Sequence, residues 1–339
     1  RDVRGKGKGC DRRRLDATLV MLAGVAAEQR HARGQRHVAD AEGDDPWWGG
    51  EPLWTGARKA GLRSATMFWP GSEAPIQGWH PDHWLPFDAS MPAQARADQA
   101  LAWLSGPPAA RPHLVTLYFD ALDSAGHAHG PGSEQARTAL HDIDAALGHL
   151  LDGLAAQGLR EAVNIVVVSD HGMADVAPGN VVAVEDMVAP AEARVVSIGQ
   201  VIGIEPFPGH AAEVERRLIG AHDHYDCWRK GELPARWHYG SHPRIPSIVC
   251  QMHTGWDALP RDYLARRREG GSRGSHGYDP ESRAMRGVFG AAGPAFRQGA
   301  VLPPFDNVDV YPLLARLLGI VPAPNDGDPR TLAPALREP

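Results

Sequence analysis

Three short segments of the chain combine aspartate and histidine at close spacing. Asp123 and His127 are four residues apart in FDALDSAGHAHGP. Asp170 and His171 are adjacent in VVVSDHGM, and His276 lies in RGSHGYDP. Carboxylate oxygen and imidazole nitrogen are the ligands that zinc takes outside thiolate sites, and two such ions can bind the attacking and leaving oxygens of a phosphoryl transfer. These five side chains are therefore candidate metal ligands.

Each segment also has a purely structural interpretation. An aspartate at the end of a strand often caps a helix or forms a turn, and DHG alone is a short motif with many false matches. The chain has 17 histidines, so some clusters arise by chance, and we interpret HDHYD at residues 222–226 as loop surface. His129 is interpreted as a solvated loop histidine, with contact to a phosphate oxygen or a metal ligand as the alternative. The metal interpretation depends on the three segments occurring together and in order.

The elements around these segments predict a mainly parallel sheet. The apolar runs Leu114–Phe119 and Ile165–Val168 are typical of buried strands. Between them, Ser133 caps a predicted helix with apolar positions at Leu140, Ile143, Leu147, Leu151 and Leu154. This strand, helix, strand order is a crossover unit. Ligands of such sheets bind outside the carboxyl ends of the strands, so the first two segments are expected on one rim and a long loop can bring His276 to them.

Residues 194–271 break the alternation of strands and helices. The run VVSIGQVIGIEP predicts a hairpin, a helix is expected near 211–219, and further strands are expected near 227–237 and 247–252. We interpret residues 194–271 as an inserted subdomain over one end of the sheet. The last helix is expected at 307–318, ending at a glycine with prolines beyond.

Composition excludes several classes of function. The chain of 339 residues has a net charge of -6, which argues against a binder of nucleic-acid polymers. No apolar run reaches the length that a membrane span requires. Three cysteines are too few for a disulfide-rich scaffold. Cys227 and Cys250 could form one bridge, and the alternative is that all three thiols are buried or inert.

The segments DSAGHAHGP, VVVSDHGM, GSHGYDP and NVDVYPLLARLLGI, followed by PAPNDG, occur in that order along the chain. With WWGGEPLW and FWPGSE, they resemble the nucleotide pyrophosphatase/phosphodiesterase family, particularly the bacterial type I phosphodiesterases of the alkaline phosphatase superfamily. The resemblance runs from about Trp47 to the C-terminus. It implies an alkaline-phosphatase-like three-layer α/β/α sandwich with a mainly parallel sheet. It also implies hydrolysis of phosphodiester and pyrophosphate bonds in nucleotides, with release of nucleoside 5′-monophosphates.

The resemblance further implies two Zn²⁺ ions. One would be bound by Asp123, His127 and His276. The other would be bound by Asp170 and His171, together with an aspartate from the first strand of the family. The chemical partner is a small nucleotide or phosphodiester, and the compartment is the periplasm or the exterior of the cell.

The resemblance also gives the nucleotide base an aromatic platform. Tyr118 and Phe87 are the candidates, with core packing as the alternative for both. Within the superfamily, a phosphomonoesterase or phosphonate hydrolase is the alternative activity, and a sulfatase is disfavoured because the chain has no C-x-P-x-R or S-x-P-x-R element. A remnant that binds metal and nucleotide without turnover is the alternative outside enzymes.

The N-terminal 45 residues depart from the family. The family begins with a hydrophobic strand ending in an Asp-Gly pair, followed by a TFPN-type motif that carries a threonine nucleophile. Thr18 is the only threonine before Thr55, and its neighbours do not match that motif. Asp16 lacks the strand and the glycine expected of the missing zinc ligand.

We therefore set residues 1–45 apart from the catalytic domain at 46–339. Residues 12–27 imitate a signal peptide, with a basic start and a short apolar core. A second interpretation is a short helix over Ala17–Ala27. The interpretation that we favour is a frameshift or a misassigned start, with the correct frame resuming shortly before Pro46. It predicts the loss of an inner strand, a second zinc site short of one ligand, and impaired turnover.

Overall fold

The computed structural model describes residues 18–24, 50–266 and 273–337. They form two compact units, each made of separate stretches of sequence. The first unit contains the described residues up to Asp120, residues 141–170 and the residues from Phe289 onward. The second unit contains residues 121–140 and 171–288. Described helices of both units are too short or too polar to cross a membrane.

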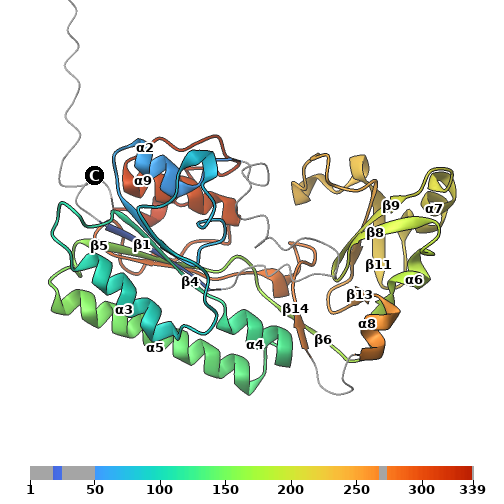
Figure 1. Ribbon diagram of the computed structural model, residues 1–339, viewed down its shortest axis with the longest axis horizontal. Helices are drawn as coiled ribbons and strands as arrows, with labels where there is room; N and C mark the ends of the chain where they lie inside the picture. Colours follow the sequence, from blue (N-terminus) through green and yellow to red (C-terminus); the bar gives the residue numbers. More distant parts are fainter. Residues whose placement is uncertain (1–17, 25–49, 267–272, 338–339) are drawn as a thin grey trace, which may run out of the picture. The chain divides into compact units, whose positions relative to one another are not determined.

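The first unit is built on a six-stranded sheet. In spatial order its strands are β15 (Phe289–Ala292), β5 (Val163–Val168), β1 (Thr18–Gly24), β4 (Leu114–Phe119), β2 (Ser64–Met67) and β3 (His83–Leu85). All neighbours are parallel except β15, which runs antiparallel to β5. Figure 1 shows α2 (Leu53–Lys59) and α9 (Val310–Leu318) on one face of this sheet, with α3 (Ala93–Leu104) and α5 (Glu134–Ala156) on the other. The expected three-layer α/β/α sandwich is confirmed.

The elements on either side of the first aspartate segment agree with the sequence. Strands β4 and β5 lie where the apolar runs predict them. The backbone N–H of Ala136 donates to Ser133 Oγ at 3.1 Å, as expected of a helix cap. Leu140 was expected in the core and is 52% exposed. That expectation is wrong because the buried stripe of α5 is rotated, running through Ala139, Ala146, Leu150 and Leu154.

Strand β1 overturns two expectations for the N-terminal segment. Residues Thr18–Gly24 form a strand, so the helix expected over Ala17–Ala27 is wrong for these residues. The inner strand is also not lost, because β1 pairs in parallel with both β4 and β5. A continuous apolar run such as TLVMLAG fits a strand in the middle of a parallel sheet, and periodicity alone does not distinguish it from a buried helix. The other residues of the N-terminal segment, including Cys10 and Asp16, lie outside the described residues.

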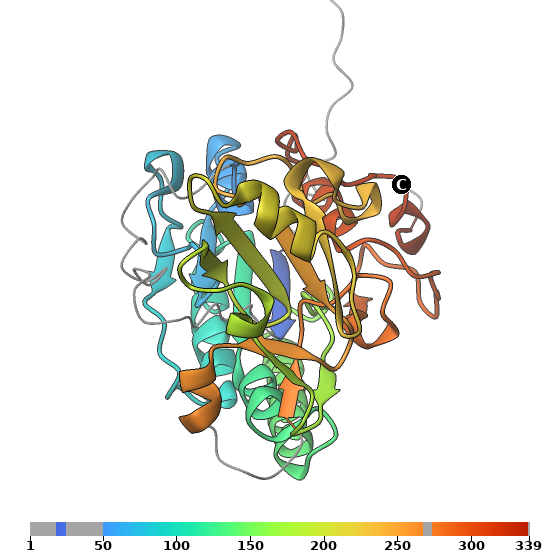
Figure 2. The ribbon, with the colours of Figure 1, turned by 90° about the vertical axis from the view of Figure 1, so that its right-hand side faces the viewer.

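The second unit contains a five-stranded antiparallel sheet. Its strands, in spatial order, are β10 (Gly220–Ala221), β11 (Tyr225–Arg229), β12 (Ile248–Met252), β9 (Val201–Pro206) and β8 (Ala193–Ser197). Figure 2 shows α7 (Ala211–Leu218) lying across these strands, and Val214 and Leu218 pack with Ile202 and Ile204 in its core. The predicted hairpin and helix are confirmed. The strand expected at 227–237 is wrong beyond Arg229, where β11 ends and residues 230–232 form a 3₁₀ turn. Pro234, which has no N–H for a ladder hydrogen bond, precedes a second 3₁₀ turn at 235–237.

A disulfide joins Cys227 and Cys250, which are direct partners in the register of β11 and β12. Of the two alternatives for these cysteines, a bridge or inert thiols, the structure has the bridge. It closes a loop over a sequence separation of 23 residues. Cross-linking a loop of this size stabilises a folded protein by about 3 kcal/mol, chiefly by restricting the unfolded chain.

The second unit also contains two small sheets and three further short α-helices. Strand β14 (Arg273–Ser275) pairs antiparallel with β6 (Ala174–Val176), and β13 (Asp257–Leu259) pairs in parallel with β7 (Val181–Ala183). The helices are α4 (Ala121–His129), α6 (Val184–Met187) and α8 (Arg261–Arg266). The boundaries of an inserted subdomain at 194–271 stay a prediction.

Candidate metal centre

Helix α4 places two of the candidate ligands on one face. Asp123 and His127 are four residues apart, which brings their side chains together on a helix. Asp123 Oδ1 lies 3.4 Å from His127 Nε2, and the aspartate side chain is only 3% exposed. A buried carboxylate needs a positive or hydrogen-bonding partner, so this position favours a charged ligand or a metal ion.

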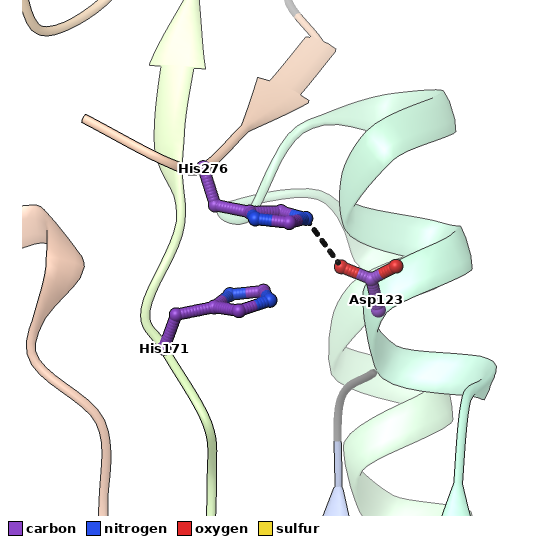
Figure 3. A group of neighbouring side chains, drawn as sticks. All are labelled: Asp123, His171 and His276. Atoms are coloured by element: carbon purple, nitrogen blue, oxygen red, sulfur yellow. Dashed lines mark ion pairs between the residues drawn. The ribbon is translucent and has the colours of Figure 1, made fainter. Parts of the chain in front are cut away.

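The pairing of β14 with β6 brings two further histidines to the same place. Ser275 is the register partner of Ala174, so His276 leaves one strand where the chain from His171 enters the other. Their imidazole rings stack with centroids 3.5 Å apart and planes 16° apart. Figure 3 shows both rings pointing toward Asp123 on α4.

Asp123, His171 and His276 form one group of possible ligands. One donor atom from each lies within 4.8 Å of the others. His276 Nε2 is 3.6 Å from Asp123 Oδ1, and the ring of His127 is 4.8 Å from that of His276. The sequence assigns His171 to a different ion from Asp123, and the two assignments meet in this group because paired ions of such sites lie only about 3.5 to 4 Å apart.

Hydrogen bonds and burial prepare the imidazoles for metal binding. His127 Nδ1 lies 3.0 Å from the carbonyl oxygen of Gly274, and His171 Nδ1 lies 2.8 Å from that of Gly172. A carbonyl only accepts, so Nδ1 carries the proton in these bonds and Nε2 is left as the ligand atom. Burial, followed by the neighbouring His171 and His127, lowers the pKa of His276 to about 3. His276 is therefore neutral near pH 7, which is the form that binds a metal.

The sequence model of the type I phosphodiesterase / nucleotide pyrophosphatase family matches residues 25–279. The chain belongs to this family. Among curated members, venom phosphodiesterase CdcPDE of Crotalus durissus collilineatus is 34% identical over 301 residues, covering 86% of this chain and 36% of the relative. Ectonucleotide pyrophosphatase/phosphodiesterase family member 3 of Rattus norvegicus is 34% identical over 318 residues, covering 89% of this chain and 35% of the relative. The chain thus spans about a third of the length of these relatives.

Solved structures agree with the family assignment. Human ectonucleotide pyrophosphatase/phosphodiesterase 5 superposes with a TM-score of 0.81 at 29% identity, covering 87% of this chain and 77% of that one. The murine protein, in an inactive threonine-to-alanine form in complex with AMP, gives a TM-score of 0.80 at 29% identity, with the same coverage of 87% and 77%. The expected alkaline-phosphatase-like α/β class is confirmed.

Two glycines next to the candidate ligands allow neighbouring backbone to approach closely. A Cβ atom at Gly274 would collide with the carbonyl oxygen of Gly126 on α4 and with Met173. A Cβ atom at Gly172 would collide with the carbonyl oxygens of Ala284 and Arg286. These two glycines therefore permit close packing of the backbone. Gly277 has a φ of 92°, a left-handed conformation that favours glycine.

Asp170, the remaining candidate ligand, belongs to the first unit of this family member. It is exposed and directly follows β5 and Ser169. Its carbonyl oxygen lies 3.5 Å from Asn307 Nδ2. The role of Asp170 as a zinc ligand, together with the division of the five ligands between two ions, stays a prediction. His129 is exposed, as expected of a solvated residue, but it is the last residue of α4, so the loop expected there is wrong.

The two aromatic candidates lie near each other in the first unit. Tyr118 is 5% exposed and its ring centroid is 6.4 Å from that of Phe87, which is 48% exposed. The carbonyl oxygen of Tyr118 accepts a hydrogen bond from Arg96 Nη1 at 2.7 Å, and the same nitrogen donates to Asp120 Oδ1 at 2.9 Å. Sequence reasoning missed Arg96, a buried cation that fixes the end of β4. Tyr118 belongs to the buried core, in agreement with the core-packing alternative, whereas Phe87 is half exposed and meets the buried Phe68 edge-on at a centroid distance of 5.5 Å. The role of either ring as a base platform stays a prediction.

Proposed function

We propose that this chain binds small nucleotide substrates and hydrolyses their phosphodiester or pyrophosphate bonds, with nucleoside 5′-monophosphates as products. The observation that carries the proposal is the group of Asp123, His171 and His276 in a member of a phosphodiesterase family. AMP bound to the murine relative, together with the venom phosphodiesterases among the curated relatives, supports this substrate class. The secreted venom relatives also support a proposal that the protein acts outside the cytoplasm, in the periplasm or beyond it.

The donor set fits zinc. It offers a carboxylate oxygen and imidazole nitrogens, which are ordinary zinc ligands, and it contains no thiolate. We propose that Asp123, His127 and His276 hold one Zn²⁺, with His171 and Asp170 contributing to a second. Bound zinc would supply positive charge to the phosphate oxygens and lower the pKa of a coordinated oxygen.

Side chains of the chain itself give the substrate its orientation. Phe87, which is 48% exposed, offers an aromatic face for a nucleobase, since every base presents a π-face that stacks on aromatic rings. Tyr118 lies in the core and is proposed to support Phe87 from a ring-centroid distance of 6.4 Å. Arg96 holds the backbone of Tyr118 and the carboxylate of Asp120 from a buried position, so it positions this segment without needing to touch substrate.

The proposal includes weak turnover. In the family pattern the first strand ends in an Asp-Gly pair, whereas β1 ends in Ala23-Gly24. The second ion would therefore lack one carboxylate ligand. No threonine in a TFPN-type motif follows β1 in the sequence, so a double displacement has no hydroxyl nucleophile to begin it. Binding of metal and nucleotide with slow hydrolysis is the expected result.

The reaction class can be tested by comparing three substrates at equal zinc concentration. We expect the residual rate to be highest for 4-nitrophenyl thymidine 5′-phosphate, a diester, and lower for 4-nitrophenyl phosphate and 4-nitrophenyl sulfate. Faster hydrolysis of the monoester would instead support a phosphomonoesterase. Calorimetric titration with AMP and zinc separates an enzyme from a remnant that only binds, because the remnant would bind AMP and hydrolyse none of the three.

A further inference from the structure

A polar network in the second unit surrounds the segment that carries His276. Gln200, in the turn between β8 and β9, donates from its side-chain Nε2 to Asp257 Oδ1 and to Ser275 Oγ. Ser275 is 4% exposed and directly precedes His276. One neighbour of the candidate ligand is therefore held by a side-chain amide.

A second amide holds the other neighbour. Gln251 of β12 is 8% exposed, and its Nε2 lies 3.2 Å from the carbonyl oxygen of Gly277, which directly follows His276. The same nitrogen lies 3.0 Å from the carbonyl oxygen of Gln200. The two glutamines are thus joined to each other as well as to the residues on either side of the histidine.

A buried ion pair fixes this network. Asp257 is fully buried, and its Oδ2 pairs with Arg273 at the start of β14. Its other oxygen accepts from Gln200, so both oxygens of the carboxylate have partners. A buried charge with two partners resists displacement, because losing either one leaves it inadequately solvated. The carboxylate therefore gives the Gln200 amide a fixed orientation.

The network acts where regular pairing ends. The register of β14 with β6 extends from Arg273 to Ser275 and stops before His276. Gly277 has a left-handed φ of 92°, so the chain turns sharply directly after the histidine. The direction of the His276 ring thus depends on contacts outside the ladder.

We propose that Gln200 and Gln251 are positioning residues for His276, holding the residues before and after it so that its imidazole points at Asp123. The inference rests on the proposed function, in which His276 binds a metal ion. Partners that orient metal ligands contribute about 10- to 100-fold to metal affinity. Glutamine suits this role because its primary amide carries two N–H donors and can bind two acceptors at once.

The test compares Gln251→Met and Gln200→Met with a control, Ser197→Ala. Each methionine variant keeps the side-chain length and removes the amide donors. Ser197 Oγ accepts from the backbone N–H of Gly203 at 2.8 Å and donates to the carbonyl oxygen of Val201 at 2.9 Å, so these bonds involve neither Ser275 nor Gly277. Zinc affinity is measured by competition with a chelator. In the metal-free protein, thermal unfolding and the imidazole NMR signals of His276 are recorded.

We expect zinc affinity to fall by about 10- to 100-fold in both methionine variants, with shifted His276 signals, and to be unchanged in Ser197→Ala even if that control unfolds at a lower temperature. Unchanged zinc affinity and unchanged His276 signals in a folded methionine variant would overturn the inference and leave the proposed function standing. If the unaltered protein binds no zinc, or if His276→Ala does not weaken binding, the proposed function fails. The imidazole signals then still decide whether the glutamines orient the ring.

Discussion

Hydrolysis of 4-nitrophenyl thymidine 5′-phosphate by this chain is expected to be at least about 10³-fold slower than by an intact family member assayed beside it. Removing the nucleophile of a hydrolase that forms a covalent intermediate typically costs this much or more, and the remaining rate comes from binding and charge stabilisation. The reason lies in the sequence after β1, where no threonine occurs between Thr18 and Thr55.

A matched control tests whether the missing threonine causes the slow hydrolysis. Replacing the nucleophilic threonine of the intact relative by alanine should reduce its rate to the level of this chain, while leaving its zinc content unchanged. Turnover by this chain within about tenfold of the intact relative would show that another group supplies the nucleophile, and the account of its N-terminal segment would be wrong.

Asp123→Asn should lower zinc affinity by more than about 100-fold, beyond what the loss of an orienting partner costs. Asp123 Oδ1 lies 3.4 Å from His127 Nε2 and 3.6 Å from His276 Nε2, so this oxygen is central to the group. Asparagine keeps the shape of the side chain and removes its charge. The loss should therefore appear in zinc affinity, measured by chelator competition, with the circular dichroism spectrum unchanged.

The same unit provides a control for this substitution. Asp226 Oδ2 lies 3.2 Å from His253 Nε2, a pair of the same two residue types that does not belong to the group. Asp226→Asn should leave zinc affinity unchanged. Equal zinc affinity in Asp123→Asn and Asp226→Asn would show that Asp123 does not bind the metal.

The sequence predicts those parts of the site that depend on local pattern. The run LVTLYF gives β4, and the spacing of Asp123 and His127 places both on one face of α4. The DHG and SHG segments give His171 and His276, which the β14 and β6 pairing brings together. The order of these segments along the chain carried the prediction, because HDHYD at 222–226 holds four aspartate and histidine side chains and contributes none of them to the group.

Other features depend on contacts distant in sequence. The run TLVMLAG reads equally well as a short helix, and only its pairing with β4 and β5 makes it an inner strand. The sequence pattern also does not indicate that Arg96 fixes the end of β4. An arginine is buried where the fold brings acceptors to its guanidinium, and those acceptors are distant in sequence. The contacts of Gln200 and Gln251 could not be predicted from the sequence either, because the acceptors of their amides come from other parts of the chain.

The most direct test of the account is an anomalous difference map at the zinc edge, from crystals of this chain grown with zinc. We predict a peak about 2.0 to 2.2 Å from a carboxylate oxygen of Asp123 and an imidazole nitrogen of His276. A map with peaks only at exposed histidines elsewhere, and none at this group, would contradict the claim that these side chains form a metal centre.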